Sequence, residues 1–168
     1  FFPALKNGKY GFVNKDGTWV ISPTFEEVGT FSEKIGTFRE NNYWGTLDPE
    51  GKILSEAKWE SIGSFVKGLA IAEAAGKHYL IRANGELAFP EGIDKISRLK
   101  EGLYLIANNT KKGVLNAAGN PILPLDFDQI QVENKDFFIV TKDKLSGIMR
   151  ANGDTFLSLK YSEVAIDW

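Results

Sequence analysis

The chain has 168 residues, with 20 basic and 22 acidic side chains and a net charge of −2. Hydrophobic residues make up 43% of it, and 12 Phe, 5 Tyr and 4 Trp are among them, which predicts a folded globular protein. The basic residues are dispersed, and a nucleic-acid partner would require a basic patch, so we expect none. Cysteine is absent, which excludes disulfides, thiolate metal sites and cysteine nucleophiles.

The sequence shows neither a membrane-spanning segment nor a secretion signal. No apolar run approaches the roughly 18–20 residues of a membrane helix, so we expect no membrane insertion. The first residue is Phe1, and no signal peptide is visible. We therefore expect a segment of a longer protein rather than a processed mature chain.

One sequence pattern recurs along the whole chain. It begins as Tyr10-Gly11-Phe12-Val13 and closes at Gly17, and its five closing glycines fall 34 residues apart. They are Gly17, Gly51, Gly85, Gly119 and Gly153. Short apolar runs separated by Gly, Asn, Asp and Pro predict strands, because helical repeats would show apolar residues at i, i+3, i+4 and i+7. The period divides one domain, residues 1–168, into units 1–34, 35–68, 69–102, 103–136 and 137–168.

Each unit is predicted to form a three-stranded meander. In the second unit the strands are Ile35 to Arg39, Tyr43 to Asp48 and Lys52 to Ser55. The last two are joined by three residues ending in glycine, which is typical of a hairpin with a left-handed glycine. A crossover of about a dozen residues follows, in which a large apolar residue and a β-branched residue lie three apart, as in Trp59 and Ile62. This pair fits either a short strand or one helical turn.

The apolar pattern predicts that the units stack. Adjacent residues of the second strands are both apolar, as in Phe12-Val13 and Leu80-Ile81, so both faces of each sheet must be covered. No distinct capping sequence occurs at either end, and closure would remove the exposed faces. We therefore predict an all-β, propeller-like closed ring of five units; the alternative is an open, solenoid-like array.

The repeat resembles the WG-repeat family, also called KWG repeats. The second unit carries the motif as Trp44-Gly45-Thr46-Leu47-Asp48 with Gly51, and continues with Phe65-Val66-Lys67-Gly68-Leu69-Ala70. The third and fifth units are degenerate, with His78-Tyr79 and Ser146-Gly147 at the Trp-Gly position. The resemblance implies a bacterial interaction module, often secreted or at the cell envelope, without assigned catalysis.

An acidic residue recurs in the crossover. We interpret it as structural, with each carboxylate accepting hydrogen bonds from its own crossover backbone. His78 is the only histidine, so it has no imidazole neighbour for zinc, and no nucleophile elbow, P-loop or dinucleotide fingerprint is present. We expect no catalytic residue, metal or cofactor. The recurring acids are Glu26, Glu60, Asp94 and Asp128, with Ser162 in the fifth unit.

Four residues are candidates for ligand binding. Trp19 and Trp168 have no aromatic counterparts in the other units, so they are candidate stacking surfaces. Tyr43 and His78 complete the set. The sequence favours a non-catalytic binding or scaffolding module for a protein or peptide. The alternatives are a carbohydrate-binding module at the cell envelope and, third, a hydrolase.

Overall fold

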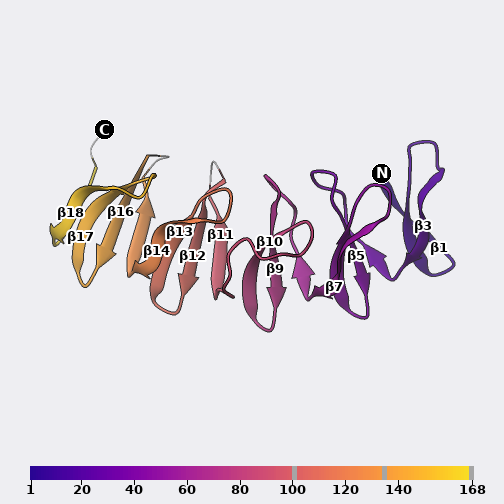
Figure 1. Ribbon diagram of the computed structural model, residues 1–168, viewed down its shortest axis with the longest axis horizontal. Coiled ribbons are helices and arrows are strands. Elements are labelled where there is room, and N and C mark those ends of the chain that lie inside the picture. Colours follow the sequence, from indigo (N-terminus) through magenta and orange to yellow (C-terminus); the bar gives the residue numbers. More distant parts are fainter. Residues whose placement is uncertain (100–101, 134–135, 167–168) are drawn as a thin grey trace. The chain divides into compact units, whose positions relative to one another are not determined.

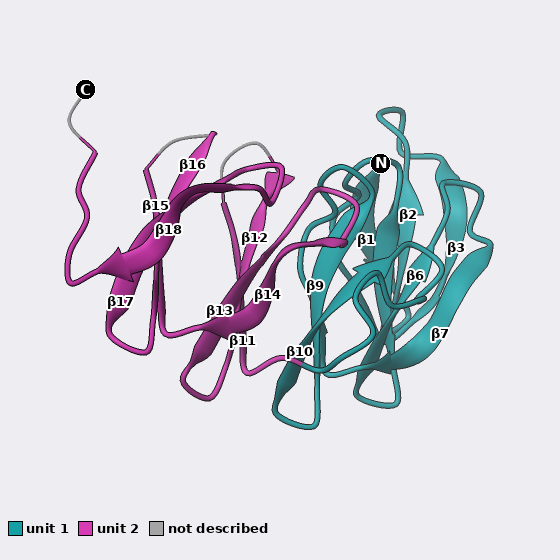
Figure 2. Cartoon of the chain, turned by 60° about the vertical axis from the view of Figure 1, so that its left-hand side comes forward, with its two compact units in different colours: residues 1–92 teal, residues 93–168 magenta. Residues whose placement is uncertain are grey.

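The described part of the chain is built from β-strands, labelled β1 to β18, and no helix occurs in it (Figure 1). The computed structural model describes residues 1–99, 102–133 and 136–166. The chain divides into two compact units, residues 1–92 and 93–168 (Figure 2). Within the described ranges, no helix has the length and hydropathy needed to cross a membrane.

The first compact unit contains three antiparallel sheets, here called sheets 1 to 3. Their strands follow one another in chain order within each sheet. Sheet 1 comprises β1 (Phe2–Lys6), β2 (Lys9–Val13) and β3 (Trp19–Phe25). Sheet 2 comprises β4 (Glu27–Val28), β5 (Gly36–Glu40), β6 (Tyr43–Leu47) and β7 (Ile53–Trp59). Sheet 3 comprises β8 (Ser61–Ile62), β9 (Leu69–Ala74) and β10 (Lys77–Arg82).

The second compact unit contains two antiparallel sheets of four strands, here called sheets 4 and 5. Sheet 4 comprises β11 (Lys95–Arg98), β12 (Tyr104–Asn108), β13 (Lys111–Leu115) and β14 (Pro121–Phe127). Sheet 5 comprises β15 (Gln129–Val132), β16 (Phe137–Lys142), β17 (Leu145–Arg150) and β18 (Thr155–Tyr161). Both sheets repeat the strand order of sheet 2, so the 34-residue period is a structural period.

The predicted meander is confirmed with two corrections. The crossover pair is split between two sheets: Trp59 ends β7, whereas Ile62 lies in β8, which pairs with β9. The short-strand reading of the crossover is therefore right, and it gives sheets 2, 4 and 5 a fourth strand. The third unit lacks the predicted strand after Gly85, where the structure has only the isolated bridge between Ile81 and Leu87. Pro90 and Gly92 follow this segment closely.

The predicted hairpin glycines are confirmed. All five have positive φ, between +76° and +91°. In the first turn the N–H of Gly17 donates to the carbonyl of Asn14, and the N–H of Asn14 donates to the carbonyl of Thr18. This pattern recurs in all five units, because only glycine adopts the left-handed conformation without strain.

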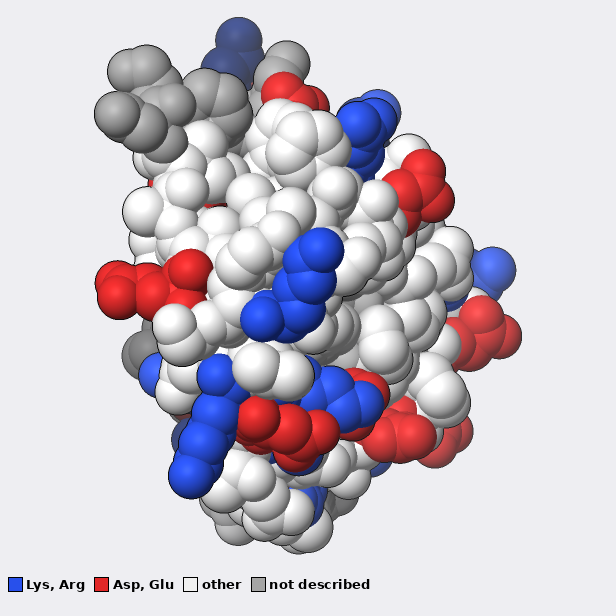
Figure 3. Space-filling model, turned by 90° about the vertical axis from the view of Figure 1, so that its left-hand side faces the viewer, with Lys and Arg blue, Asp and Glu red and all other residues white. Residues whose placement is uncertain are grey.

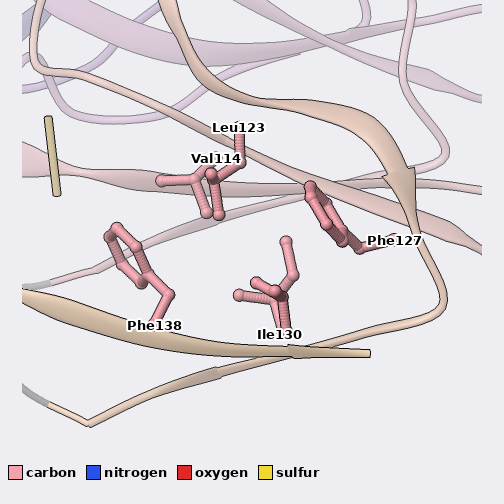
Figure 4. Close-up of a cluster of buried hydrophobic side chains, with 6 residues drawn as sticks. Val114, Leu123, Phe127, Ile130 and Phe138 are labelled. Carbon is pink, nitrogen blue, oxygen red and sulfur yellow. The ribbon is translucent and has the colours of Figure 1, made fainter. Parts of the chain in front are cut away.

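Apolar cores lie between successive sheets within each compact unit. Phe12 and Ile21 of sheet 1 pack with Phe38 and Leu47 of sheet 2. In the second unit, Val114 and Leu123 of sheet 4 face Phe138 of sheet 5 (Figure 4). Stacking within the first compact unit therefore covers both faces of sheet 2, as the paired apolar residues predicted. Whether the stack closes into a ring stays a prediction, as does the single domain.

Candidate functional site

The residues predicted to bind ligand lie on separate sheets. Trp19 is half-buried at the start of β3, and Tyr43 is 45% exposed at the start of β6. His78 is half-buried in β10, and its Nε2 lies 3.3 Å from Oε1 of Glu73. No hydrogen bond, ion pair or ring contact joins any two of these three described residues. Trp168 lies outside the described residues.

The recurring crossover acids are structural, but their partners differ from the prediction. Asp94 Oδ2 accepts from the N–H of Asn109 at 2.7 Å, and Asp128 Oδ2 accepts from the N–H of Asp143 at 2.8 Å. Both donors begin the hairpin turn of the following sheet and have positive φ, and Glu60 holds Ala75 in the same way. These carboxylates therefore fix the next sheet's turn instead of their own crossover.

Asp128 has a second partner. Lys111 Nζ donates to its Oδ1 at 2.6 Å. This hydrogen bond, together with the one from the N–H of Asp143, lowers the pKa of Asp128, and the same contact raises the pKa of Lys111. Among the described residues, no cluster of three or more His, Asp or Glu side chains could hold a metal ion.

A row of three hydroxyl side chains crosses sheet 2. Thr37, Thr46 and Ser55 are cross-strand neighbours on β5, β6 and β7, and we call them the hydroxyl row. The equivalent rows 34, 68 or 102 residues away are apolar. They read Pro3, Phe12 and Ile21 in sheet 1, Leu105, Val114 and Leu123 in sheet 4, and Ile139, Ile148 and Leu157 in sheet 5. Sheet 2 therefore places hydroxyls where its relatives place core residues.

The inner part of the hydroxyl row contacts sheet 3. Thr46 is fully buried, and its Oγ1 donates to the carbonyl of Ala83, in the turn after β10. Ser55 is 5% exposed and lies against Gly85, where an added Cβ would come within 2.3 Å of Ser55 Oγ. These two hydroxyls are thus enclosed by the sheet interface.

The outer end of the row opens into a cavity of about 280 Å³. Trp44 lines it next to Thr37, and β8 and the loop after it form the facing wall. None of the described residues that line it is ionisable. Its hydroxyl side chains are those of Thr30, Ser32, Thr37, Ser61 and Ser64.

Hydrogen bonds between two loops hold the rim of this cavity. Ser32 Oγ accepts from the N–H of Phe65 at 2.9 Å. The two carboxylate oxygens of Glu33 accept from the N–H groups of Lys67 and Gly68, each at 2.7 Å. Because these bonds fix the loops that follow β4 and β8 to one another, the cavity is preformed.

Trp44 belongs to a second row on the same face of sheet 2. Arg39 and Trp59 are its cross-strand partners. Arg39 Nη1 pairs with Glu27 at 3.0 Å, but its buried Nε has no hydrogen-bond acceptor among the described residues. The buried Nε1 of Trp59 likewise lacks an acceptor there. Unpaired buried donors are uncommon in proteins, and here two of them flank the indole that lines the cavity.

A second candidate surface lies on sheet 5. The ring of Phe156, in β18, is 54% exposed and lies 5.2 Å from the ring of Phe137. The guanidinium of Arg150 lies over Phe156 at 5.1 Å, beside a hollow lined by Asp136, Phe137 and Arg150. Figure 3 shows this end of the chain, where uncharged side chains dominate the centre of the view and charged ones gather below.

Neither of these two surfaces was predicted from the sequence, although the repeats contain a signal for the hydroxyl row beside the cavity. Comparing positions 34 residues apart shows Thr46 where Phe12, Leu80, Val114 and Ile148 stand. The Phe156 cluster had no such signal, because its members are distant in sequence.

Comparison with protein families identifies the repeat. The model for the WG containing repeat matches residues 10–44, 44–77 and 113–145, more than half of the chain. The chain therefore belongs to the family of WG-repeat proteins, as the resemblance predicted. The matches do not begin at His78 or Ser146, the two degenerate positions. No curated protein sequence matches the chain.

Several solved structures are similar to the chain in fold. A Kluyveromyces lactis Hsv2 variant, with loop 6CD replaced by a Gly-Ser linker, matches with a TM-score of 0.45 and 11% identity. The match covers 86% of this chain and 58% of Hsv2. The N-terminal domain of Nup159 matches with a TM-score of 0.37 and 12% identity. This match covers 78% of the present chain and 42% of the Nup159 chain. A Bacteroides caccae protein of unknown function matches with a TM-score of 0.33 and 14% identity, and the match covers 90% of the present chain and 74% of that protein. Because all these TM-scores are below 0.5, the similarities support no inference about function.

Proposed function

We propose that the chain is a non-catalytic binding and scaffolding module that engages a protein or peptide partner. The observation that carries this proposal is the outer strand of sheet 5. β18 lies at the edge of its sheet, with no strand beyond it among the described residues. An extended peptide that pairs with such an edge gains backbone hydrogen bonds, and side-chain contacts supply selectivity.

β18 is less protected than β3, β7 and β14, the equivalent outer strands of sheets 1, 2 and 4. β3 contains Pro23, β14 contains Pro121 and Pro124, and β7 carries Glu56 and Lys58. Prolines and charges on edge strands normally prevent pairing with other chains. β18 reads Thr-Phe-Leu-Ser-Leu-Lys-Tyr, with no proline and a single charge.

The side chains beside β18 suggest the chemistry of the partner. Phe156 offers exposed aromatic surface, and Arg150 next to it offers a guanidinium. Aromatic and arginine side chains dominate the binding energy of many protein interfaces. The proposed partner is an extended peptide that places an apolar side chain on Phe156 and a carboxylate at Arg150.

A displayed library of random peptides tests this proposal. Peptides selected on the purified chain should bind about tenfold more weakly to Phe156→Ala and Arg150→Glu, measured by fluorescence anisotropy. Ser158→Pro should have the same effect, because it copies Pro124 at the equivalent position of β14, which the repeat tolerates. Phe1→Ala, another exposed phenylalanine, is the matched control. Peptides that bind all four variants equally would contradict the proposal.

Ring closure is a separate part of the proposal. Strand addition uses the edge of sheet 5 rather than its faces, so it is compatible with both a closed ring and an open array. Closure predicts that deleting residues 1–6 strongly lowers the melting temperature. A truncated chain as stable as the original would support the open array. The secreted or cell-envelope location implied by the family resemblance also belongs to this proposal.

Carbohydrate is a second candidate ligand class. The sequence suggested it for Trp19 and Trp168, but the observation that favours it is the cavity beside Trp44, with its five hydroxyl side chains.

A further inference from the structure

We infer that the cavity between sheets 2 and 3 is a binding site for a single neutral sugar ring. This inference deepens the carbohydrate candidate and is independent of peptide binding at β18. It rests on the hydroxyl row, the lining of the cavity and the glycines that keep it open.

Thr37 is the member of the hydroxyl row that lines the cavity, and it gives the cavity part of its polar wall. At the position of Thr37 the equivalent residues are the exposed Pro3, the half-buried Ile71 and Leu105, and the buried Ile139. A hydroxyl there gives up apolar burial, which a folding requirement alone does not explain. The hydroxyl of Thr46 donates to the carbonyl of Ala83, whereas the hydroxyl-bearing side chain of Thr37 lines the cavity.

The lining selects an uncharged polyhydroxy ligand. Hydroxyl side chains both donate and accept hydrogen bonds, and those of Thr30, Thr37 and Ser61 suit the alternating donors and acceptors of sugar hydroxyls. No ionisable side chain lines the cavity, so a phosphate, carboxylate or ammonium group would lose its hydration without compensation. The indole of Trp44 supplies the apolar surface on which the C–H face of a sugar ring packs. Its volume of about 280 Å³ limits the occupant to one small ring.

Two glycines keep this space open. A Cβ at Gly29 would lie 2.2 Å from Thr37 Oγ1 and 4.0 Å from Cζ3 of Trp44. At Gly63 the backbone has no positive φ, and a Cβ would meet only the carbonyl of Ile71 at 3.4 Å. Gly63 therefore accepts a side chain without backbone strain, and that side chain would occupy the cavity.

The equivalent place between sheets 4 and 5 has a different set of side chains. Leu105 replaces Thr37, Lys112 replaces Trp44, and Gln129 replaces Ser61. Lys112 Nζ donates to Gln129 Oε1 at 2.5 Å, so these two side chains pair with each other. The side chains that line the cavity beside the complete Trp-Gly motif are thus not repeated at the described positions between sheets 4 and 5.

Isothermal titration calorimetry with glucose, galactose, mannose and N-acetylglucosamine tests the inference. At least one of the four should bind saturably to the wild-type chain, and glycerol, which has no ring face, should not. Gly63→Val should abolish binding, and Thr37→Val and Trp44→Phe should each weaken it about tenfold. Thr18→Val, in an exposed turn, and Tyr43→Phe, the neighbour of Trp44, are the matched controls and should bind as wild type.

The outcomes separate this inference from the proposed function. No saturable binding of any of the four sugars up to about 10 mM would overturn it, as would a folded Gly63→Val that binds normally. If circular dichroism shows that Gly63→Val is unfolded, Thr37→Val decides, since it preserves the shape of the side chain. Phe156→Ala should leave sugar binding unchanged, and Gly63→Val should leave peptide binding unchanged, so each proposal can fail alone.

Discussion

The interface between sheets 2 and 3 and the interface between sheets 4 and 5 are built by the same repeat with opposite chemistry. Sheets 4 and 5 meet through an apolar row, and Leu105, Val114 and Leu123 face Phe138 and Val140. At the same positions, sheets 2 and 3 have Thr37, Thr46 and Ser55 facing Ala70 and Ala72. One interface is filled by large apolar side chains, whereas the other combines hydroxyls, small residues and a cavity.

The proposed sugar site would place function at one interface of the repeat and stability at the others. Each repeat needs its neighbours to bury its faces, so most interfaces must be apolar. One interface can then become polar if aromatic residues retain enough packing. Trp59 does so here, because it is 5% exposed and its ring lies 5.4 Å from that of Tyr79.

The largest effect is expected in the apolar interface. Phe138→Ala copies Ala70 of sheet 3 into sheet 5 and should destabilise the chain by about 3–5 kcal/mol, because it leaves a cavity among Val114, Phe127 and Ile130. Thr37→Ala, beside an existing cavity, should cost less than about 1 kcal/mol. Urea denaturation measures both, and equal losses would remove the distinction between the two interfaces.

A pair of turn glycines tests whether adjacent sheets are stacked as described. Gly85→Val should destabilise by about 2–3 kcal/mol, because it combines strain at φ +76° with a clash against Ser55. Gly17→Val has the same strain at φ +78° but no neighbour within 4 Å, so about 1 kcal/mol is expected. An unchanged melting temperature in both variants would refute the turn assignment.

A reciprocal exchange tests the polar row directly. Thr46→Val leaves the carbonyl of Ala83 without its donor, and Val114→Thr places a hydroxyl in an apolar cluster. Each should cost about 1–3 kcal/mol in thermal or urea unfolding. If both exchanges are neutral, the chemistry of the two interfaces is interchangeable, and the hydroxyl row has no specific role.

The smallest effect concerns the crossover acid and its pH dependence. The pKa of Asp128 is lowered in the folded state by Lys111 and by the N–H of Asp143, so its contribution is present above its unfolded-state pKa. That contribution is lost as the pH falls through the lowered pKa. Asp128→Asn and Lys111→Met should therefore flatten the acid limb of a plot of urea midpoint against pH. Lys112→Met, whose partner Gln129 is uncharged, should leave that limb unchanged.

The repeat fold could be predicted from the sequence, whereas the cavity and the partners of the crossover acids could not. The 34-residue spacing, the hairpin glycines and the paired apolar residues determine the sheets, because these features act locally or between adjacent units. The partners of Asp94 and Asp128 were mispredicted, since the donors lie 15 residues further along, in the next sheet. The cavity depends on Thr37 and Ser61 meeting across two sheets, which periodicity alone does not reveal.

The hydroxyl row itself was visible in the sequence, because Thr37, Thr46 and Ser55 each interrupt an apolar column of the aligned repeats. Trp44, the residue that lines the cavity, had been assigned to the repeat motif rather than to a site. In a repeat protein, a position that departs from its equivalents is therefore informative even when the residue is a common one.

Mapping of backbone amide shifts by two-dimensional NMR during titration with the same four monosaccharides tests the central claim most directly. The account predicts saturable shifts for Gly29, Thr37 and Gly63, with the equivalent amides of Ser97, Leu105 and Gln131 unmoved. Shifts spread equally over both sets, or absent from Gly29, Thr37 and Gly63, would contradict a specialised site between sheets 2 and 3.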